Sequence, residues 1–262
     1  MLINSLVADR KTLIKVLSDK LNLKPEYKGA PTFMYIIGDY TVMKDGSIEV
    51  DEDKADKRLL LDLYSEGFID CSFDKDIETI EIKIPYEGHT GISLTNLTYL
   101  MVSRAKLINR SIRCKDAFFI NERFIERLKE VTPKTFEEFM SVVEEVDANS
   151  INKGFEFDKD GIGFAGFPVT TNSDEVKAYM DLVSLINKMA LTQKRVLIDT
   201  SDAVNEKYEF RGFLLRLGMK GNEYKNTRKI LLEHLNGNCA FRIEDQAEAF
   251  REKHRITKPE VG

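Results

Sequence analysis

The spacing of apolar residues along the chain alternates between a helical and a strand period, and each change predicts an element. In residues 9–22 the apolar positions fall three or four apart behind Asp9, a suitable N-cap, which is typical of an amphipathic helix. Residues 32–50 are instead rich in β-branched and aromatic side chains and are interrupted by Gly38 and Gly46, which predicts a β-meander. A helix and two strands are predicted next, at 57–66, 68–73 and 79–84.

After residue 90 the pattern is mainly helical. Residues 155–164 are an exception, because they alternate around Asp160-Gly161 and so predict a β-hairpin. Thr132-Pro133 is a suitable N-cap and first-position pair for the helix that follows it. A short strand is expected at 117–120, and helices are expected at 93–110, 121–131, 135–146, 175–194, 204–217 and 223–235.

Together these elements predict an α+β fold, with an antiparallel sheet that carries helices on one face in the N-terminal part and a helical C-terminal part. The 262 residues allow one large domain or two to three small ones. We divide the sequence into an α+β unit with the β-meander at 1–90, a mixed α/β region ending in the hairpin at 91–172, and a helical region with a polar tail at 173–262.

The composition is that of an ordinary globular protein, with 42% hydrophobic and 32% charged residues. The net charge of -5 is modest and does not by itself demand a nucleic-acid or membrane partner. No stretch of about 18 uninterrupted apolar residues is present, so we expect no membrane span. The N-terminus also lacks the apolar core of a secretory signal, and we therefore expect a cytoplasmic protein.

Residue types that carry chemistry are few. The three cysteines, Cys71, Cys114 and Cys239, are far apart and form no CxxC pair, so we expect half-buried free thiols in place of a disulfide framework or a zinc site. The three histidines share no metal-ligand spacing, and no serine-nucleophile motif is present. The sequence therefore predicts a protein that is not an enzyme and that needs no cofactor or metal.

One glycine-bearing loop has two interpretations. Gly88, His89 and Gly91 come just before a predicted helix, where free backbone N–H groups can hold a phosphate or nucleotide. The alternative is a surface loop and helix cap. We favour the cap, because neither of the glycine-rich nucleotide motifs, GxxxxGK[ST] and GxGxxG, is present.

Basic residues cluster in two stretches, which could contact nucleic acid or an acidic partner. The second stretch falls on the two helices joined at Gly218–Asn222, which could be a helix-turn-helix-like pair or a packed helical hairpin with a solvated basic face. If nucleic acid is bound there, affinity should fall steeply with salt. The first cluster comprises Arg104, Lys106, Arg110, Arg113 and Lys115, and the second includes Arg211, Arg216, Lys220, Lys225, Arg228 and Lys229.

Several blocks of the chain resemble a family described as "virulence-related protein", found in phages and conjugative elements of low-GC Gram-positive bacteria. The blocks are Asn205–Gly218, Glu223–Leu232, Lys28–Thr32, Ile37–Val42 with Lys44-Asp45-Gly46, and Asp174–Tyr179. The resemblance carries no known reaction, ligand or catalytic residue. It implies cargo of a mobile element that acts inside a bacterial host cell.

That context favours a non-enzymatic interaction protein that binds a host protein complex, with inhibition of a host defence system, in the manner of an anti-CRISPR protein, as the expected role. The alternative is a nucleic-acid-binding module that serves replication, transfer or regulation of the element. Neither the partner nor the oligomeric state follows from the sequence.

Overall fold

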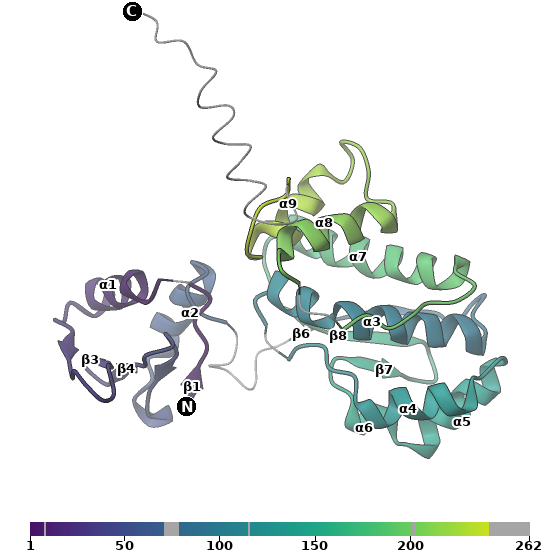
Figure 1. Ribbon diagram of the computed structural model, residues 1–262, viewed down its shortest axis with the longest axis horizontal. Helices are drawn as coiled ribbons and strands as arrows, with labels where there is room; N and C mark the ends of the chain where they lie inside the picture. The colour runs from purple at the N-terminus through teal and green to yellow at the C-terminus, as the bar shows by residue number, and fades with distance from the viewer. Residues whose placement is uncertain (8, 71–78, 115, 201–202, 241–262) are drawn as a thin grey trace, which may run out of the picture. The chain divides into compact units, whose positions relative to one another are not determined.

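The computed structural model describes residues 1–7, 9–70, 79–114, 116–200 and 203–240 (Figure 1). Contacts divide the chain into two compact units, an N-terminal unit of residues 1–79 with 112–115 and a C-terminal unit of residues 80–111 with 116–262. The predicted α+β class is confirmed, with antiparallel strand pairs in the N-terminal part and mainly helices in the C-terminal part.

The N-terminal unit is a five-stranded antiparallel sheet in the order β1-β5-β4-β3-β2. Its register aligns Ile3, Ile48 and Val42 on one face, and all three are fully buried. The strands are β1 (Leu2–Ile3), β2 (Glu26–Tyr27), β3 (Tyr35–Ile37), β4 (Tyr40–Val42) and β5 (Ile48–Glu49). The predicted β-meander is thus confirmed.

Two helices cover that buried face. They are α1 (Arg10–Leu21) and α2 (Lys57–Ser65), and their leucines form one apolar cluster with the sheet residues. Asp9 caps α1 as predicted, because its side chain accepts a hydrogen bond from the N–H of Lys11. A short 3-10 turn, η1 (Glu52–Lys54), precedes α2. Of the strand expected at 68–73, Ile69 bridges Ser5, and residues 71–73 lie outside the described residues.

Cys114 corrects one expectation. It belongs to the N-terminal unit, is 6% exposed and is disulfide-bonded, so the prediction of a free thiol is wrong there. The spacing of the cysteines could not predict this disulfide. The chain leaves the N-terminal unit after Thr79, and only residues 112–115 return to it. Cys239 is free, as predicted, but exposed. The prediction for Cys71 lies outside the described residues.

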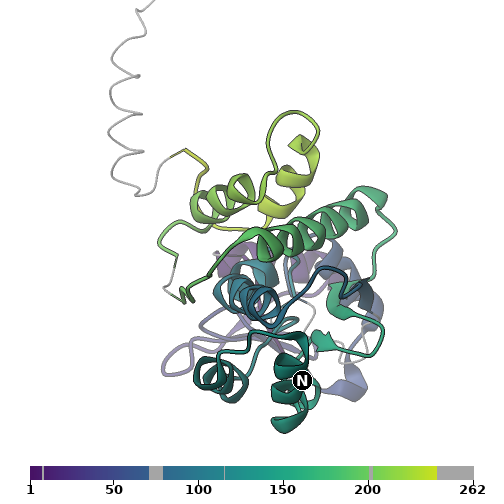
Figure 2. The same ribbon diagram turned by 90° about the vertical axis from the view of Figure 1, so that its right-hand side faces the viewer.

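The C-terminal unit is layered around α3 (Gly91–Ser111), against which α7 (Ser173–Thr192) packs. Figures 1 and 2 both show α8 and α9 on the same side of the small sheet as α3 and α7, and α4 and α5 on its opposite side. This sheet has the order β6-β8-β7. The remaining elements are β6 (Thr79–Ile84), α4 (Glu122–Val131), α5 (Phe136–Glu145), α6 (Ala148–Ile151), β7 (Phe155–Phe157), β8 (Ile162–Pro168), α8 (Glu206–Leu217) and α9 (Lys225–Glu233).

Apart from residues 112–115, the predicted regions 91–172 and 173–262 fall within this one unit, in which α3 contacts both α5 and α7. The predicted hairpin is confirmed, with Phe157 opposite Ile162 across its turn. At residues 117–120 the expected strand is reduced to a single bridge, between Phe119 and Lys153.

The cap predicted at Thr132 is wrong. Thr132 has a positive φ of 47° and ends α4, whereas Thr135 is the N-cap of α5. Thr135 and Glu138 form a reciprocal capping box, which satisfies N–H groups at the start of α5. Thr132-Pro133 instead belongs to the connection between the two helices.

Buried phenylalanines attach the α4–α5 pair to the sheet. Phe139 meets Phe157 edge to face at 5.0 Å between ring centroids, and Phe155 meets Phe164 at 5.2 Å. Aromatic pairs in these arrangements add to the stabilisation from burial. The helices on this side of the unit are therefore held in a fixed place relative to β7 and β8.

Candidate nucleic-acid interface

The C-terminal unit carries two helical hairpins on opposite sides, which we call the α4–α5 hairpin (residues 121–147) and the α8–α9 hairpin (residues 205–235) (Figure 1). Each is formed by two amphipathic helices joined by a short connection. Their exposed charges differ in sign, and that difference defines the candidate site.

On the α8–α9 hairpin five cations are exposed against two acids. Among the described residues, none of these five side chains makes an ion pair or a hydrogen bond. The exposed acids are Glu223 and Glu233. The cations, which we call the α8–α9 basic surface, are Arg211, Arg216, Lys220, Lys225 and Lys229.

On the α4–α5 hairpin the balance is reversed, with eight exposed acids against three cations. The cations are Arg123, Lys129 and Lys134. The acids are Glu122, Glu126, Glu130, Glu137, Glu138, Glu144, Glu145 and Asp147. An exposed, net-positive surface therefore exists on one side of this unit although the chain as a whole is acidic.

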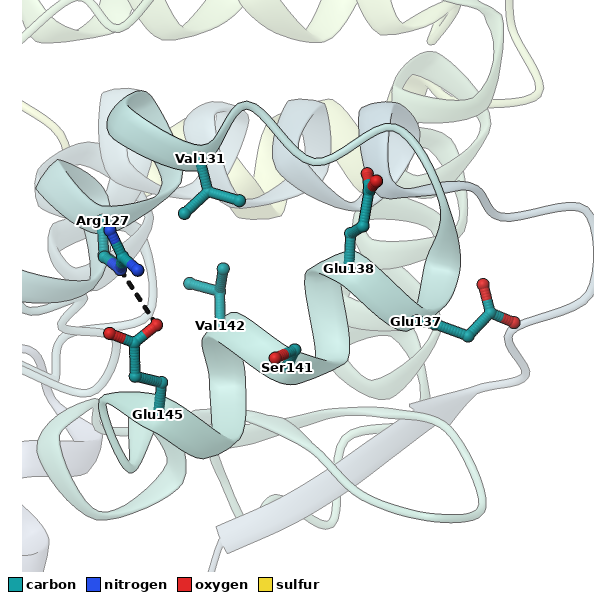
Figure 3. A pocket seen from close by; sticks show the side chains of 7 residues that line it. All are labelled: Arg127, Val131, Glu137, Glu138, Ser141, Val142 and Glu145. Atoms are coloured by element: carbon teal, nitrogen blue, oxygen red, sulfur yellow. Dashed lines mark hydrogen bonds and ion pairs between the residues drawn. The ribbon is translucent and has the colours of Figure 1, made fainter.

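Figure 3 shows an open groove of about 380 Å³ between α4 and α5, with Val131 and Val142 facing each other across it. At one end Arg127 donates to Glu145 over 2.9 Å and to Glu130 over 3.1 Å. At the other end Glu138 accepts the N–H groups of Lys134 and Thr135, and these bonds hold the pKa of Glu138 below its ordinary value. The ion pairs and the cap serve the hairpin itself, and the groove offers no nucleophile with a neighbouring base.

The first basic cluster of the sequence is largely engaged by the protein. Arg104 of α3 lies 5.3 Å from the ring centroid of Phe213 and 3.9 Å from Asp199, and burial lowers the pKa of its guanidinium. Arg110 forms an ion pair of 2.9 Å with Glu206 at the start of α8. These two arginines fasten α8 to α3, so their charge is not free for a phosphate.

Two further members of that cluster, Arg113 and Lys106, are described by the structure. Arg113 belongs to the N-terminal unit, where it donates to the carbonyl of Tyr64 over 2.5 Å and lies 4.6 Å from the centroid of its ring. Lys106 is exposed on α3. Lys115 lies outside the described residues. Three of the five clustered cations, Arg104, Arg110 and Arg113, are therefore engaged by other groups of the protein.

Arg228, predicted with the second cluster, has a structural role. Its guanidinium donates to the carbonyls of Met219 and Gly221 over 2.8 and 3.0 Å. Those carbonyls follow the end of α8 at Gly218, so Arg228 fixes the connection between the two helices. The other predicted members of this cluster are exposed on the hairpin, namely Arg211, Arg216, Lys220, Lys225 and Lys229.

The Gly88–Gly91 loop is a helix cap rather than an open anion site. The N–H groups of His89, Thr90 and Gly91 donate to the carbonyl of Tyr86, to Oγ of Ser93 and to the carbonyl of Lys134. His89 as a residue is 8% exposed, and its ring has Nδ1 3.0 Å from Ser93 Oγ and Nε2 2.8 Å from Asn187 Oδ1. Burial lowers the pKa of His89, and a neutral ring therefore joins α3 to α7.

Two kinds of site are not formed by the part of the chain that the structure describes. Its histidines, cysteines and carboxylates nowhere gather in threes that could hold a metal ion. Across the same residues, each helix is too short or too polar to span a membrane.

No protein-family model matches the chain, and no curated protein or solved structure matches it either. What the protein binds is therefore inferred from its own residues. They define an α+β protein whose C-terminal unit exposes, on one helical hairpin, cations without an ion pair to any described residue, and on the other an excess of carboxylates.

Proposed function

We propose that the protein binds nucleic acid, without catalysing a reaction on it, through the α8–α9 basic surface. The observation that carries this proposal is the set of five exposed cations that make no ion pair with any described residue, on a unit whose opposite hairpin carries the excess of exposed carboxylates. Arginine and lysine side chains in such a set contact phosphates and release the counterions condensed on the nucleic acid.

The arrangement favours a polyanion over a small anion. The cations extend along two helices and their connection, from Arg211 to Lys229, and do not converge on a pocket. Each one can contact a different phosphate of an extended strand. Five separate contacts add up to useful affinity, although each is individually weak and screened by salt.

The test is binding of fluorescently labelled oligonucleotides to the full chain, measured by anisotropy near 0.1 M salt. The test variant is R211A/K229A and the matched control is R123A/K129A. Each removes one exposed arginine and one exposed lysine from a helical hairpin, so the change in net charge is the same. The counterion relation predicts a loss of roughly 20- to 60-fold for the test variant, since each phosphate contact contributes about five- to eightfold at this salt concentration.

The control should bind like the wild type. Equal weakening in both variants would mean that net charge and not the α8–α9 basic surface governs binding. Absence of binding by the wild type at low salt would remove the proposal.

Inhibition of a host defence complex, which the resemblance implies, stays a prediction beside this proposal. Capture of one specific host protein from lysate that survives nuclease treatment is the result that would support it.

A further inference from the structure

The outward stripe of α8 has an unusual composition. This helix buries one side in the C-terminal unit, through Phe210, Phe213, Leu214 and Leu217. At about 100° per residue, the side turned away from that core carries Tyr208, Gly212 and Leu215, with Arg211 and Arg216 on its two flanks. We call these five residues the α8 outward stripe.

Gly212 is not explained by the fold. A glycine within a helix costs about 1 kcal/mol relative to alanine. Its φ is not positive, and a Cβ built there would meet only Nη1 of Arg216, at an ordinary 3.6 Å. Gly91 and Gly154 differ, because a Cβ would come within 2.4 Å and 2.1 Å of backbone oxygens at those positions. The fold requires those two glycines, whereas alanine would fit at position 212.

A bare helical backbone on an outward face suits the close approach of a partner. The same 3.6 Å distance places the guanidinium of Arg216 beside that bare backbone. Arg104, packed over Phe213 beneath the stripe, lies near enough to Arg216 for the two charges to repel, which adds to the lowering of the pKa of Arg104. Within about one turn of Gly212 on α8, Arg211 and Arg216 are positive and Glu209 is negative. The net charge beside Gly212 is therefore positive, and an anionic partner complements it.

Tyr208 lies one turn before Gly212 on the stripe and is 37% exposed. Within the described residues its ring stacks on no other aromatic ring and on no cation. An exposed aromatic ring beside arginines is the combination with which proteins bind single-stranded nucleic acids, because each unpaired base can stack on the ring. Bases within a duplex are already stacked on one another and cannot do so.

We propose that the α8 outward stripe binds single-stranded nucleic acid, with one base stacked on Tyr208, the strand closest to the helix at Gly212, and phosphates at Arg211 and Arg216. This inference rests on the proposed function and assigns its preferred ligand. A protein helix packed at Gly212 is the alternative occupant, but the positive flanks favour a polyanion.

The first test is G212A, for which stability and binding should change in opposite directions. The unfolding temperature should rise by about 2–4 °C, because alanine is the better helix former. Affinity for a labelled thymine-only strand of about 20 nucleotides should fall at least about fivefold, and further for G212L, because the added side chain holds the strand away. The matched control is S184A at an exposed position within α7, which should leave affinity unchanged.

The second test concerns the ring. Y208F keeps the stacking surface and should retain wild-type affinity, whereas Y208L should lose about tenfold. The wild type should also bind the thymine strand more tightly than a duplex of equal length.

The outcomes separate this inference from the proposed function. If no oligonucleotide binds to the wild type at low salt, both fall. Two results would overturn the single-strand site alone. In the first, binding depends on the α8–α9 basic surface, but G212A, G212L and Y208L all bind like the wild type. In the second, the duplex binds more tightly than the single strand. A salt-insensitive protein ligand displaced by G212L would identify the helix-packing alternative instead.

Discussion

The two helical hairpins of the C-terminal unit are built alike and present opposite surfaces. On the α4–α5 hairpin the central arginine, Arg127, is neutralised by Glu130 and Glu145. On the α8–α9 hairpin Arg211 and Arg216 have no such partner among the described residues. Arginine thus stabilises the α4–α5 hairpin through internal ion pairs, whereas on the α8–α9 hairpin its positive charge can bind a partner.

The arginines that touch the α8–α9 hairpin repeat this contrast. Arg110 pairs with Glu206, whose side chain is 11% exposed, and Arg228 binds two backbone carbonyls, so both hold the hairpin in place. Arg211 and Arg216 point outward. Positive charge alone therefore does not identify a binding residue, and the partner of each guanidinium has to be known.

The largest expected effect comes from reversing the free charges. The variant R211E/R216E/K225E/K229E should lose more than about a hundredfold in affinity for nucleic acid, because four phosphate contacts become repulsions. The matched variant E122Q/E126Q/E130Q of the α4–α5 hairpin should bind at least as well as the wild type. Anisotropy titrations at one salt concentration measure both. Comparable losses in the two variants would contradict the assignment of binding to one hairpin.

A stability effect of about 2 kcal/mol is expected for R110A. This substitution leaves the nearly buried Glu206 carboxylate without its cation. Breaking a fully buried pair lowers the free energy of unfolding by about 3–5 kcal/mol, and the loss here is smaller because the Arg110 side chain is 40% exposed. Urea unfolding should show this loss, while the control R123A, exposed and without an ion pair to any described residue, should stay within about 0.5 kcal/mol of the wild type. Equal midpoints for the two variants would mean that Arg110 does not fasten α8.

Removing the cap of α5 should cost about 1 kcal/mol. T135A loses the capping box that satisfies the start of that helix. S141A, at an exposed position within the same helix, has no cap to lose and should be neutral or slightly stabilising. Nucleic-acid affinity should stay unchanged in both, and a change would implicate the α4–α5 hairpin in binding.

The smallest effect is a pH dependence centred on His89, between α3 and α7. Burial lowers its pKa in the folded state, so folding favours the neutral ring. The stability it contributes is complete above the unfolded pKa of about 6.5 and is lost as the pH falls below that value. Unfolding free energies between about pH 8 and pH 5 should therefore decline more in the wild type than in H89Q. Parallel curves would assign the acid sensitivity to other groups.

Much of the fold could be predicted because its signals are local. The helix behind Asp9, the β-meander and the hairpin at Asp160-Gly161 follow from periodicity, caps and turn residues that lie within each element. One error, the helix cap predicted at Thr132, is local, because Thr135 three residues later is the actual cap. The error at Cys114 concerns a long-range contact. Residues 112–115 rejoin the N-terminal unit, and no local pattern in the sequence records that return.

The candidate site was predictable only in part. Clustering along the sequence identified Arg211, Arg216, Lys225 and Lys229, but it could not separate them from Arg110, whose partner Glu206 lies 96 residues further along the chain. One signal was readable and was missed. That signal is Gly212, a glycine that lies within a helix but outside the helix's apolar stripe. Packing inside the protein does not explain a small residue at such a position.

The salt dependence of nucleic-acid binding tests the central claim most directly. The logarithm of the association constant should fall linearly with the logarithm of salt concentration, with a slope of up to about -3.5 for a single strand if all five cations contact phosphates. Each cation removed from the α8–α9 basic surface should reduce that slope by about 0.7, and R123A/K129A should leave it unchanged. A flat response to salt, or a slope that changes equally for cations of either hairpin, would contradict the account.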